Sequence, residues 1–109
     1  MEEAGEPLWP WTVKRRCHRR WRLAPNHARA WTAYVSVGTL ADGRWWVDVV
    51  SRINRPLQLV ASEREADAEA ERWRNHIALE HSSYTGTADE WEQVECYPTQ
   101  GWQPGERAP

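Results

Sequence analysis

Residues 31–81 contain three short segments of alternating apolar and polar side chains, followed directly by one capped helical segment. The alternating segments are 31–37 (WTAYVSV), 44–50 (RWWVDVV) and 56–61 (PLQLVA). Period-two alternation is typical of strands with one buried face, and Asp42-Gly43 favours a tight hairpin because glycine adopts positive φ without steric cost. The stretch predicts an α+β fold: a three- to four-stranded antiparallel meander with one main helix packed on one face.

Asp48 constrains the register of the first hairpin. A two-residue turn would pair Val37 with Asp48 and place a carboxylate on the core face. We therefore predict a one-residue correction, either a three-residue turn or a bulge near Gly38, where a residue without Cβ bends easily. With this correction, Val37 pairs with Val47 or Val49 and the apolar sets share one face.

The second predicted strand divides its side chains between two faces. Trp45, Val47 and Val49 fall on the core face. The predicted protein-binding surface on the opposite side of the sheet consists of Tyr34, Arg44, Trp46 and Arg52. Exposed aromatic rings beside arginines suit a contact with a protein. Alternatively, an extended segment around Trp9 and Trp11, or a C-terminal strand, covers this face and closes the layer.

The helical segment 62–81 carries its own start signal. Ser62 is a favourable N-cap residue, and Glu65 three positions later completes a capping box. The apolar stripe that should face the sheet consists of Ala66, Ala70, Trp73 and Ile77. Its small residues come first, so we expect the start of the helix to lie close to the sheet, with Trp73 as the main anchor.

The 109 residues are enough for one domain, and nine Trp compensate for the absence of Phe in building a core. We expect an acidic flexible lead at 1–6, a single domain at 7–97 with its core at 31–81, and a flexible Pro/Gly-rich tail at 98–109. Residues 89–97 are compatible with either a fourth strand or a short helix.

The acidic, polar start (MEEAGEP) lacks the character of a secretory signal, and no apolar run is long enough to span a membrane. We therefore expect a cytoplasmic protein without a membrane partner. In that compartment Cys17 and Cys96 are interpreted as free thiols, with a bridge between them as the alternative.

Charge is distributed unevenly along the chain. Residues 1–55 have a net charge of +5 and residues 56–109 a net charge of −7, although the whole chain has a net charge of only −2. The positive charge is concentrated in residues 14–22 (KRRCHRRWR). Val13, Cys17 and Trp21 are spaced four apart, so this segment is compatible with a helix that has one thin apolar stripe.

Residues 14–22 give a candidate nucleic-acid site. Clustered arginines can hold phosphates, and an interleaved Trp can stack on a base. The proposed contacts are Lys14, Arg15, Arg16, Arg19, Arg20, Trp21 and Arg22, with Trp46 as a second candidate for stacking. The alternative is that these arginines pair with the acidic half of the same fold.

A three-stranded sheet followed by a helix that begins S-x-x-E-A is similar to the small arm-type DNA-binding domains of phage integrases. This resemblance covers about half of the chain and implies a sheet laid into the major groove of DNA. The chain departs from that pattern in its overall acidic balance and in having one Lys.

Other chemistry has less support. His76, Glu80 and His81 form H-x-x-x-E-H, but only His76 and Glu80 share a helical face, and zinc needs a third protein ligand. The acidic side chains of residues 63–71 could imitate phosphates or simply form a solvated helix surface. No catalytic motif or phosphate loop is present, so we expect no enzyme activity, no metal and no cofactor.

The sequence thus leads to a small non-enzymatic binding protein. The first hypothesis is association with nucleic acid through the basic Arg/Trp segment at 14–22. The alternative is a protein-binding accessory or inhibitor, for example a phage- or mobile-element-encoded factor directed at a host or defence complex. That alternative would use the exposed aromatics and the acidic helix.

Overall fold

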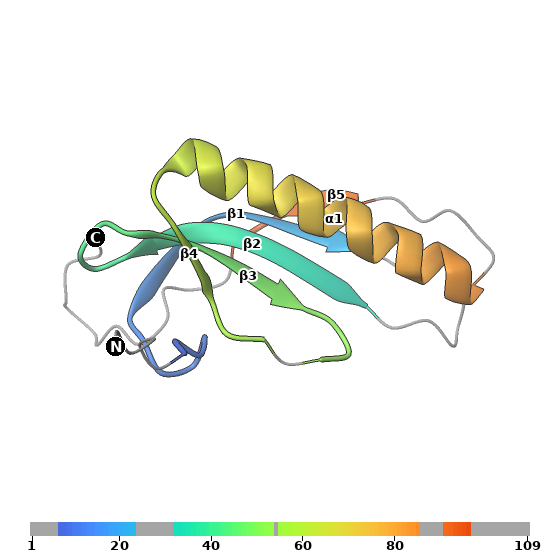
Figure 1. Cartoon of the computed structure of the whole chain (residues 1–109), viewed down its shortest axis with the longest axis horizontal. Coiled ribbons are helices and arrows are strands. Elements are labelled where there is room, and N and C mark those ends of the chain that lie inside the picture. Colours follow the sequence, from blue (N-terminus) through green and yellow to red (C-terminus); the bar gives the residue numbers. More distant parts are fainter. Residues whose placement is uncertain (1–6, 24–31, 54, 86–90, 97–109) are drawn as a thin grey trace, which may run out of the picture.

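The computed structural model describes residues 7–23, 32–53, 55–85 and 91–96, which form one sheet and one helix (Figure 1). The elements are β1 (Arg15–Leu23), β2 (Ala33–Leu40), β3 (Trp45–Val50), β4 (Gln58–Val60), α1 (Glu63–Thr85) and β5 (Trp91–Val94). The strand order is β4-β3-β2-β1-β5, and every neighbouring pair is antiparallel. The expected α+β class, with one helix on one face of an antiparallel sheet, is confirmed.

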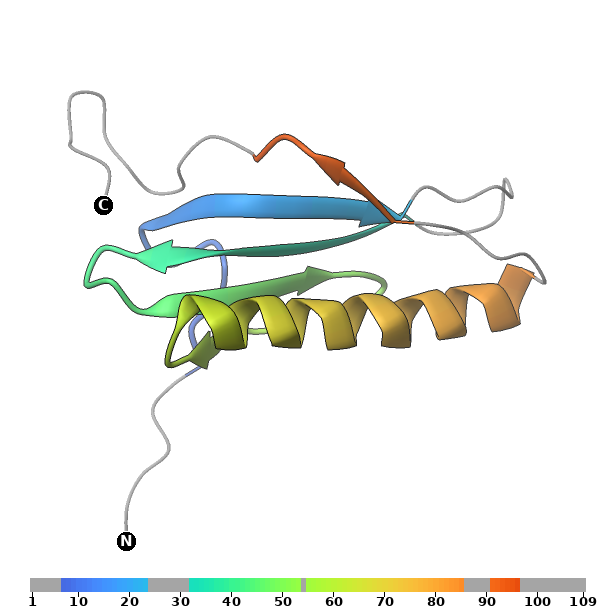
Figure 2. The same cartoon turned by 90° about the horizontal axis from the view of Figure 1, so that it is seen from above.

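The helix and the sheet form two layers, and α1 runs along one face of the sheet (Figures 1 and 2). It packs on β2, β3 and β4. The core between the layers consists of Leu23, Ala33, Val35, Val37, Val47, Val49, Ala66, Ala70 and Ile77. Ala66, Ala70 and Ile77 of the expected helical stripe are buried, and Trp73 is half-buried beside them. We call the face of the sheet opposite α1 the open face.

The basic segment is a strand, not a helix. β1 pairs with β2 along its whole length and with β5 through its second half. A strand between two others satisfies its backbone groups on both sides, and this tertiary pairing overrides the weak four-residue spacing of its apolar side chains. Residues 91–94 likewise form a strand, which joins the sheet beside β1 rather than beyond β4.

The β2–β3 hairpin has the three-residue turn that the sequence predicts. Leu40 and Arg44 are joined by a backbone hydrogen bond of 2.8 Å, which leaves residues 41–43 as the turn. Gly43 has φ of +90°, a conformation that favours glycine. Val37 therefore pairs with Val47, and Asp48 lies opposite Ser36 on the open face.

The start of α1 is capped as expected. The backbone N–H of Glu65 donates to the Ser62 hydroxyl at 3.2 Å. The Glu65 carboxylate in turn accepts from the backbone N–H of Ala61 at 2.8 Å, one residue earlier than in a standard capping box. Both groups at this helix start thus satisfy backbone donors that the helix itself leaves without partners.

A bulge in β1 lies opposite Gly38 of β2. Cys17 pairs with Gly38, but the next pair is Arg19 with Val37, so His18 is the extra residue. A Cβ on Gly38 would lie 1.9 Å from the backbone oxygen of Arg16 and 2.5 Å from the Trp46 ring. Gly38 is therefore the position at which the Trp46 ring and the bulged strand approach β2.

The open face carries a second apolar cluster at its hairpin end. Cys17, Leu40, Trp46 and Leu57 are buried there, with Leu8, Val13 and Cys96 packed against them. The N-terminal segment is fixed to this face by a hydrogen bond from the Leu57 N–H to the Leu8 carbonyl oxygen, 2.7 Å long. The expectation that Trp46 is exposed is therefore wrong. The N-terminal segment covers this end of the open face, which is the alternative stated for the sequence.

Cys17 and Cys96 form a disulfide, so their interpretation as free thiols is wrong. The bulge places Cys17 on the open face, and β5 brings Cys96 beside it. Their Cα atoms are 5.7 Å apart although 79 positions separate them in the sequence.

Several expectations concern residues outside the described ranges: the lead at 1–6, the tail at 98–109, Trp31 at the start of the first alternating segment, and residues 87–90. Within the described ranges, no helix combines the length and the apolar character needed to cross a membrane.

Replacing Gly38 by Ala should destabilise the fold by about 1–3 kcal/mol or more, because the new methyl group meets a backbone oxygen that cannot move freely. Chemical denaturation measures this change. The matched variant is Gly43→Asn, because a Cβ at this position meets nothing within 4 Å and Asn is among the residue types that adopt positive φ with the least strain. Equal stability of Gly38→Ala and the wild type would contradict the close packing.

Replacing both cysteines by serine should lower the free energy of unfolding by about 2–5 kcal/mol, since the disulfide closes a long loop. Reduction of the wild type should have the same effect. Hydrogen exchange should speed up most in β5, which is held by only four paired residues. Identical unfolding curves with and without reductant would show that the bridge contributes nothing.

Candidate functional site

The bulge in β1 divides the basic segment between the two faces of the sheet. Arg16 lies opposite Thr39, whose other neighbour is Trp45, on the side of the helix. Arg19 also lies on the helix side, opposite Val37, whereas Arg20 lies on the open face. The seven residues expected to form one nucleic-acid site therefore do not form a single surface.

Arg15 has a structural role on the open face. It is only 4% exposed, and its Nη1 atom lies 3.3 Å from Oδ2 of Asp48. Its guanidinium carbon lies 4.5 Å from the centroid of Trp46, and its Nε donates to the Pro10 carbonyl oxygen at 3.1 Å. Burial raises the pKa of Asp48, while the charges of Arg15 and Arg20 act in the opposite direction.

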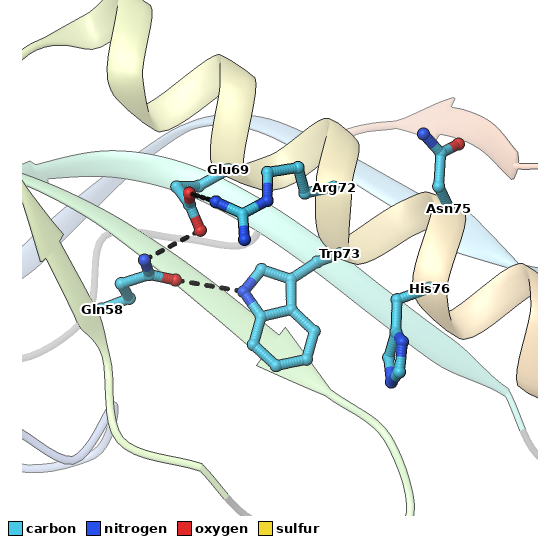
Figure 3. Close-up of a pocket in the computed structure, with 6 residues that line it drawn as sticks. All are labelled: Gln58, Glu69, Arg72, Trp73, Asn75 and His76. Atoms are coloured by element: carbon cyan, nitrogen blue, oxygen red, sulfur yellow. Dashed lines mark hydrogen bonds and ion pairs between the residues drawn. The ribbon is translucent and has the colours of Figure 1, made fainter.

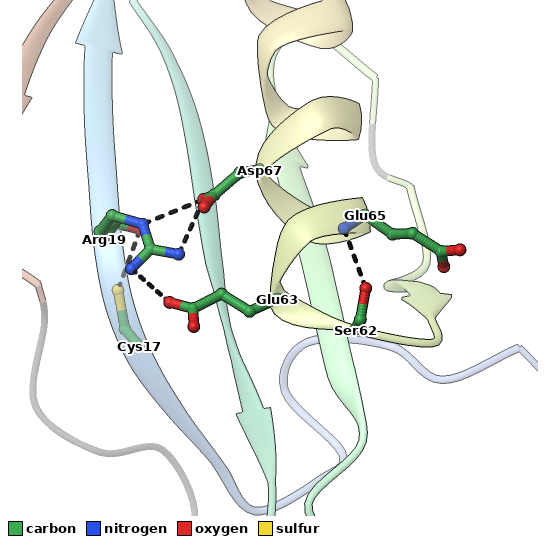
Figure 4. A network of polar contacts seen from close by, with 6 residues as sticks. All are labelled: Cys17, Arg19, Ser62, Glu63, Glu65 and Asp67. Atoms are coloured by element: carbon green, nitrogen blue, oxygen red, sulfur yellow. Dashed lines mark hydrogen bonds and ion pairs between the residues drawn. The ribbon is translucent and has the colours of Figure 1, made fainter.

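Arg19 joins β1 to the start of α1 (Figure 4). Its Nε and Nη2 atoms donate to Asp67 Oδ1 at 3.0 and 2.7 Å, and its Nη1 atom lies 3.0 Å from a Glu63 oxygen. These hydrogen bonds and charges raise the pKa of Arg19 against the effect of its partial burial. The disulfide sulfur of Cys17 lies 3.6 Å from the Arg19 carbonyl oxygen. Arg19 is thus engaged by the acidic helix.

The far half of β1 is also occupied by contacts within the fold. The Arg20 guanidinium lies over the Tyr34 ring at 4.1 Å, and Arg22 pairs with Glu92 of β5. The Trp21 ring packs against the helix-side core and is covered by the Arg74 guanidinium at 4.0 Å. The hollow that Trp21 borders is lined by Arg19, Trp21, Asp67, Ala68, Glu71 and Arg74, and so includes two carboxylates.

The basic side chains at the other end of β1 gather around the β2–β3 turn. We define the hairpin end as Lys14, Arg16, His18, Arg44 and Trp45. Lys14, Arg16, His18 and Arg44 are exposed and Trp45 is half-buried. Lys14 and Arg44 line one shallow depression, and Arg16 lies in the cross-strand row that continues through Thr39 to Trp45 and Val60.

His18 connects this surface to Trp45. One ring nitrogen of His18 lies 3.0 Å from the Thr39 hydroxyl, and the imidazole lies 5.0 Å from the Trp45 ring at an angle of 34°. Partial burial, followed by the charges of Arg16 and Arg19, lowers the pKa of His18. This shift favours the neutral imidazole at neutral pH, tilted against the Trp45 ring. The contact between His18 and Trp45 was not predicted from the sequence, because the bulge that brings them together has no local signature.

The expected protein-binding surface is dispersed. Trp46 is buried, and Tyr34 is half-buried beneath Arg20. Arg44 lies at the turn, where it pairs with Asp42 at 2.7 Å. Arg52 lines a hollow near the other end of β3, together with Ile77 and Glu80 of the helix.

Most acidic side chains of α1 are engaged within the fold. Glu63 and Asp67 bind Arg19, Glu65 caps the helix, and Glu69 accepts a hydrogen bond from Gln58. These contacts leave little of the helix as a phosphate-like surface.

His76 and Glu80 lie 3.2 Å apart at an exposed part of the helix. Within the described residues, no group of three or more His, Cys, Asp or Glu is arranged to hold a metal ion.

An open groove of about 720 Å³ lies between α1 and β4 (Figure 3). We call it the Trp73 groove, and it is lined by Gln58, Glu69, Arg72, Trp73, Asn75 and His76. The sequence predicts Trp73 only as a core anchor, and no local pattern marks Gln58 as its hydrogen-bond partner.

No protein-family model matches the chain, and neither a curated protein nor a solved structure matches it. None of these comparisons supports the resemblance of residues 31–81 to integrase arm-type domains. Function has to be inferred from the surfaces of the molecule itself.

Replacing Arg15 by Met should destabilise the fold by about 3–5 kcal/mol, because the Asp48 carboxylate is left buried without its ion-pair partner. Lys14→Met, at the adjacent exposed position, should change stability little. The difference is measured by denaturant unfolding at neutral pH.

The deficit of Arg15→Met should shrink as the pH falls through the raised pKa of Asp48. Above the unfolded-state pKa, the unfolded chain holds fewer protons at this carboxyl than the native chain, so acidification favours the native state. This effect is larger in the variant than in the wild type, because the charge of Arg15 no longer opposes the rise in the pKa of Asp48. A deficit that does not change with pH would mean that the lost ion pair is not its cause.

Proposed function

We propose that this chain is a small non-enzymatic nucleic-acid-binding domain that contacts phosphates through the hairpin end. The observation that carries the proposal is that Lys14 and Arg44 line one depression at the β2–β3 turn, while Arg16 shares a cross-strand row with Trp45, whose ring lies beside the His18 imidazole. Cations beside an aromatic platform are the arrangement that nucleic-acid-binding surfaces use.

The local charge at the hairpin end supports this proposal. Lys14, Arg16 and Arg44 are cationic, and Asp42, the carboxylate in the depression that Lys14 and Arg44 line, is paired with Arg44. The lowered pKa of His18, caused first by burial and then by Arg16 and Arg19, is consistent with a positive local potential. A phosphate group would be attracted to this end although the whole chain has a net charge of −2.

The proposed interface differs from the linear segment 14–22. Arg15 and Arg19 hold the fold together, and Arg22 is paired with Glu92. Lys14 and Arg16 stay in the interface, and His18, Arg44 and Trp45 join them. Removal of Arg15 and Arg19 would therefore report on folding rather than on binding.

The alternative of a protein-binding accessory or inhibitor has less support. Its central aromatic, Trp46, is buried, and its other proposed contacts are dispersed. The Cys17–Cys96 disulfide favours an oxidising compartment over the cytoplasmic location that composition suggests. A phage- or mobile-element-encoded factor, the example given for this alternative, stays a hypothesis.

The variant Lys14→Ala/Arg16→Ala/Arg44→Ala should lose most nucleic-acid affinity and most of its salt dependence. Each lost phosphate contact should lower the slope of log K against log salt by about 0.7–0.9. Fluorescence anisotropy with a labelled oligonucleotide, repeated at several salt concentrations, measures both quantities.

Arg22→Ala is the matched control, because Arg22 lies on the same strand but at its other end, paired with Glu92. It should bind with nearly wild-type affinity, whereas Arg16→Ala alone should bind more weakly. If the wild type fails to bind nucleic acid at low salt, or if the triple variant binds as well as the wild type, the proposal is wrong.

A further inference from the structure

The Trp73 groove contains an indole ring whose position is fixed by hydrogen bonds. Trp73 Nε1 donates to Gln58 Oε1 at 3.1 Å, and Gln58 Nε2 donates to Glu69 Oε2 at 2.9 Å (Figure 3). Arg72 pairs with the same carboxylate. This chain of contacts links the edge strand to the helix, so the ring is held in place before any ligand arrives.

Planar groups surround the indole ring. His76 meets it edge-to-face with centroids 5.9 Å apart, and in Figure 3 His76 lies beside the ring rather than over it. The Arg55 guanidinium lies over the ring, 5.0 Å from its centroid. A nucleobase can stack on an indole face or on the guanidinium plane of an arginine, so both groups provide a platform for a base.

Cations lie on both sides of this platform. The Arg72 side chain is 77% exposed, and its pairing with Glu69 orients the guanidinium without burying it. Arg52 and Arg55 line an adjoining hollow with Glu80, and Glu80 is paired with His76. The Arg72 guanidinium therefore lies at the solvent-exposed edge of the platform, where it can reach a phosphate group.

The groove and Trp45 of the hairpin end lie on the same side of the sheet. Trp45 of the hairpin end is the cross-strand neighbour of Val60, and Gln58, the partner of Trp73, is two residues earlier in β4. Two residues of a strand span about 7 Å. A single extended strand of nucleic acid can therefore pass from Trp45 to Trp73 without crossing the molecule.

The hollow beside Trp21 on the other side of the helix provides a contrast. It also contains a half-buried indole under an arginine, Arg74. However, its rim includes Asp67 and Glu71, and its Arg19 is bound to Asp67. An anionic ligand is disfavoured there although the aromatic geometry is similar.

We propose that the Trp73 groove binds an unpaired nucleotide, with the base on the Trp73–Arg55 platform and the phosphate near Arg72, so that the partner is single-stranded. This inference rests on the proposed function, because the hairpin end would supply the adjoining phosphate contacts. A duplex keeps its bases stacked inside and cannot place one in the groove.

The test is anisotropy titration of the full chain with a fluorescein-labelled single strand of about twelve nucleotides and with the matching duplex. The wild type should bind the single strand more tightly. Trp73→Leu should weaken binding of the single strand roughly 5- to 100-fold and leave binding of the duplex nearly unchanged. Arg72→Gln, at an exposed position, should weaken it and lower the salt slope by about 0.7.

Trp21→Leu is the matched control for the loss of a half-buried indole and should bind like the wild type. Thermal unfolding of both Trp variants checks the fold. If Trp73→Leu is unfolded, Arg72→Gln and Arg55→Gln replace it in the test.

If the wild type binds oligonucleotides but neither these variants nor the strandedness of the oligonucleotide alters affinity, this inference fails and the proposed function stands. Adenosine monophosphate binding without oligonucleotide binding overturns the proposed function and, with it, the single-stranded partner. Equal losses for Trp21→Leu and Trp73→Leu would also overturn the inference.

Discussion

The packing of the Trp46 ring against Gly38 is the constraint on which the rest of the sheet depends. A side chain at Gly38 would clash with both the ring and the backbone of β1, so only glycine lets the two strands approach there. β1 accommodates this contact with a bulge at His18. Every residue of β1 beyond the bulge changes face relative to an unbroken strand, and this reversal decides which arginines meet the helix and which meet the open face.

The consequences of the bulge are electrostatic as well as steric. It directs Arg19 toward the first turn of α1, where two carboxylates bind it, and it leaves Arg15 on the open face beside Asp48. These ion pairs join the elements around a core that has few large aliphatic side chains. Burying such a pair costs desolvation free energy, so removal of one partner leaves a buried charge and destabilises the fold. The disulfide at Cys17 adds a covalent link at the same place.

Local patterns were sufficient to predict the central part of the fold. The alternation in residues 33–37 and 45–50, the turn at Gly43 and the Ser62 cap each act over a few residues, and the structure has two strands, the turn and the cap at these positions. The identity of β1 was not predictable in this way, because its pairing with β2 and β5 depends on contacts distant in sequence. The disulfide also depends on distant contacts, and composition alone pointed to the wrong redox state.

The candidate site was predictable only in part, for a related reason. A run of basic residues reveals how much positive charge is present but not which charges the fold uses for itself. The structure engages Arg15, Arg19 and Arg22 with carboxylates of other elements, whereas Lys14 and Arg44 line a depression at the β2–β3 turn. About three phosphate contacts give only modest, strongly salt-dependent affinity. Tighter binding then requires that bases stack on the aromatic rings, and only unpaired bases are free to do so.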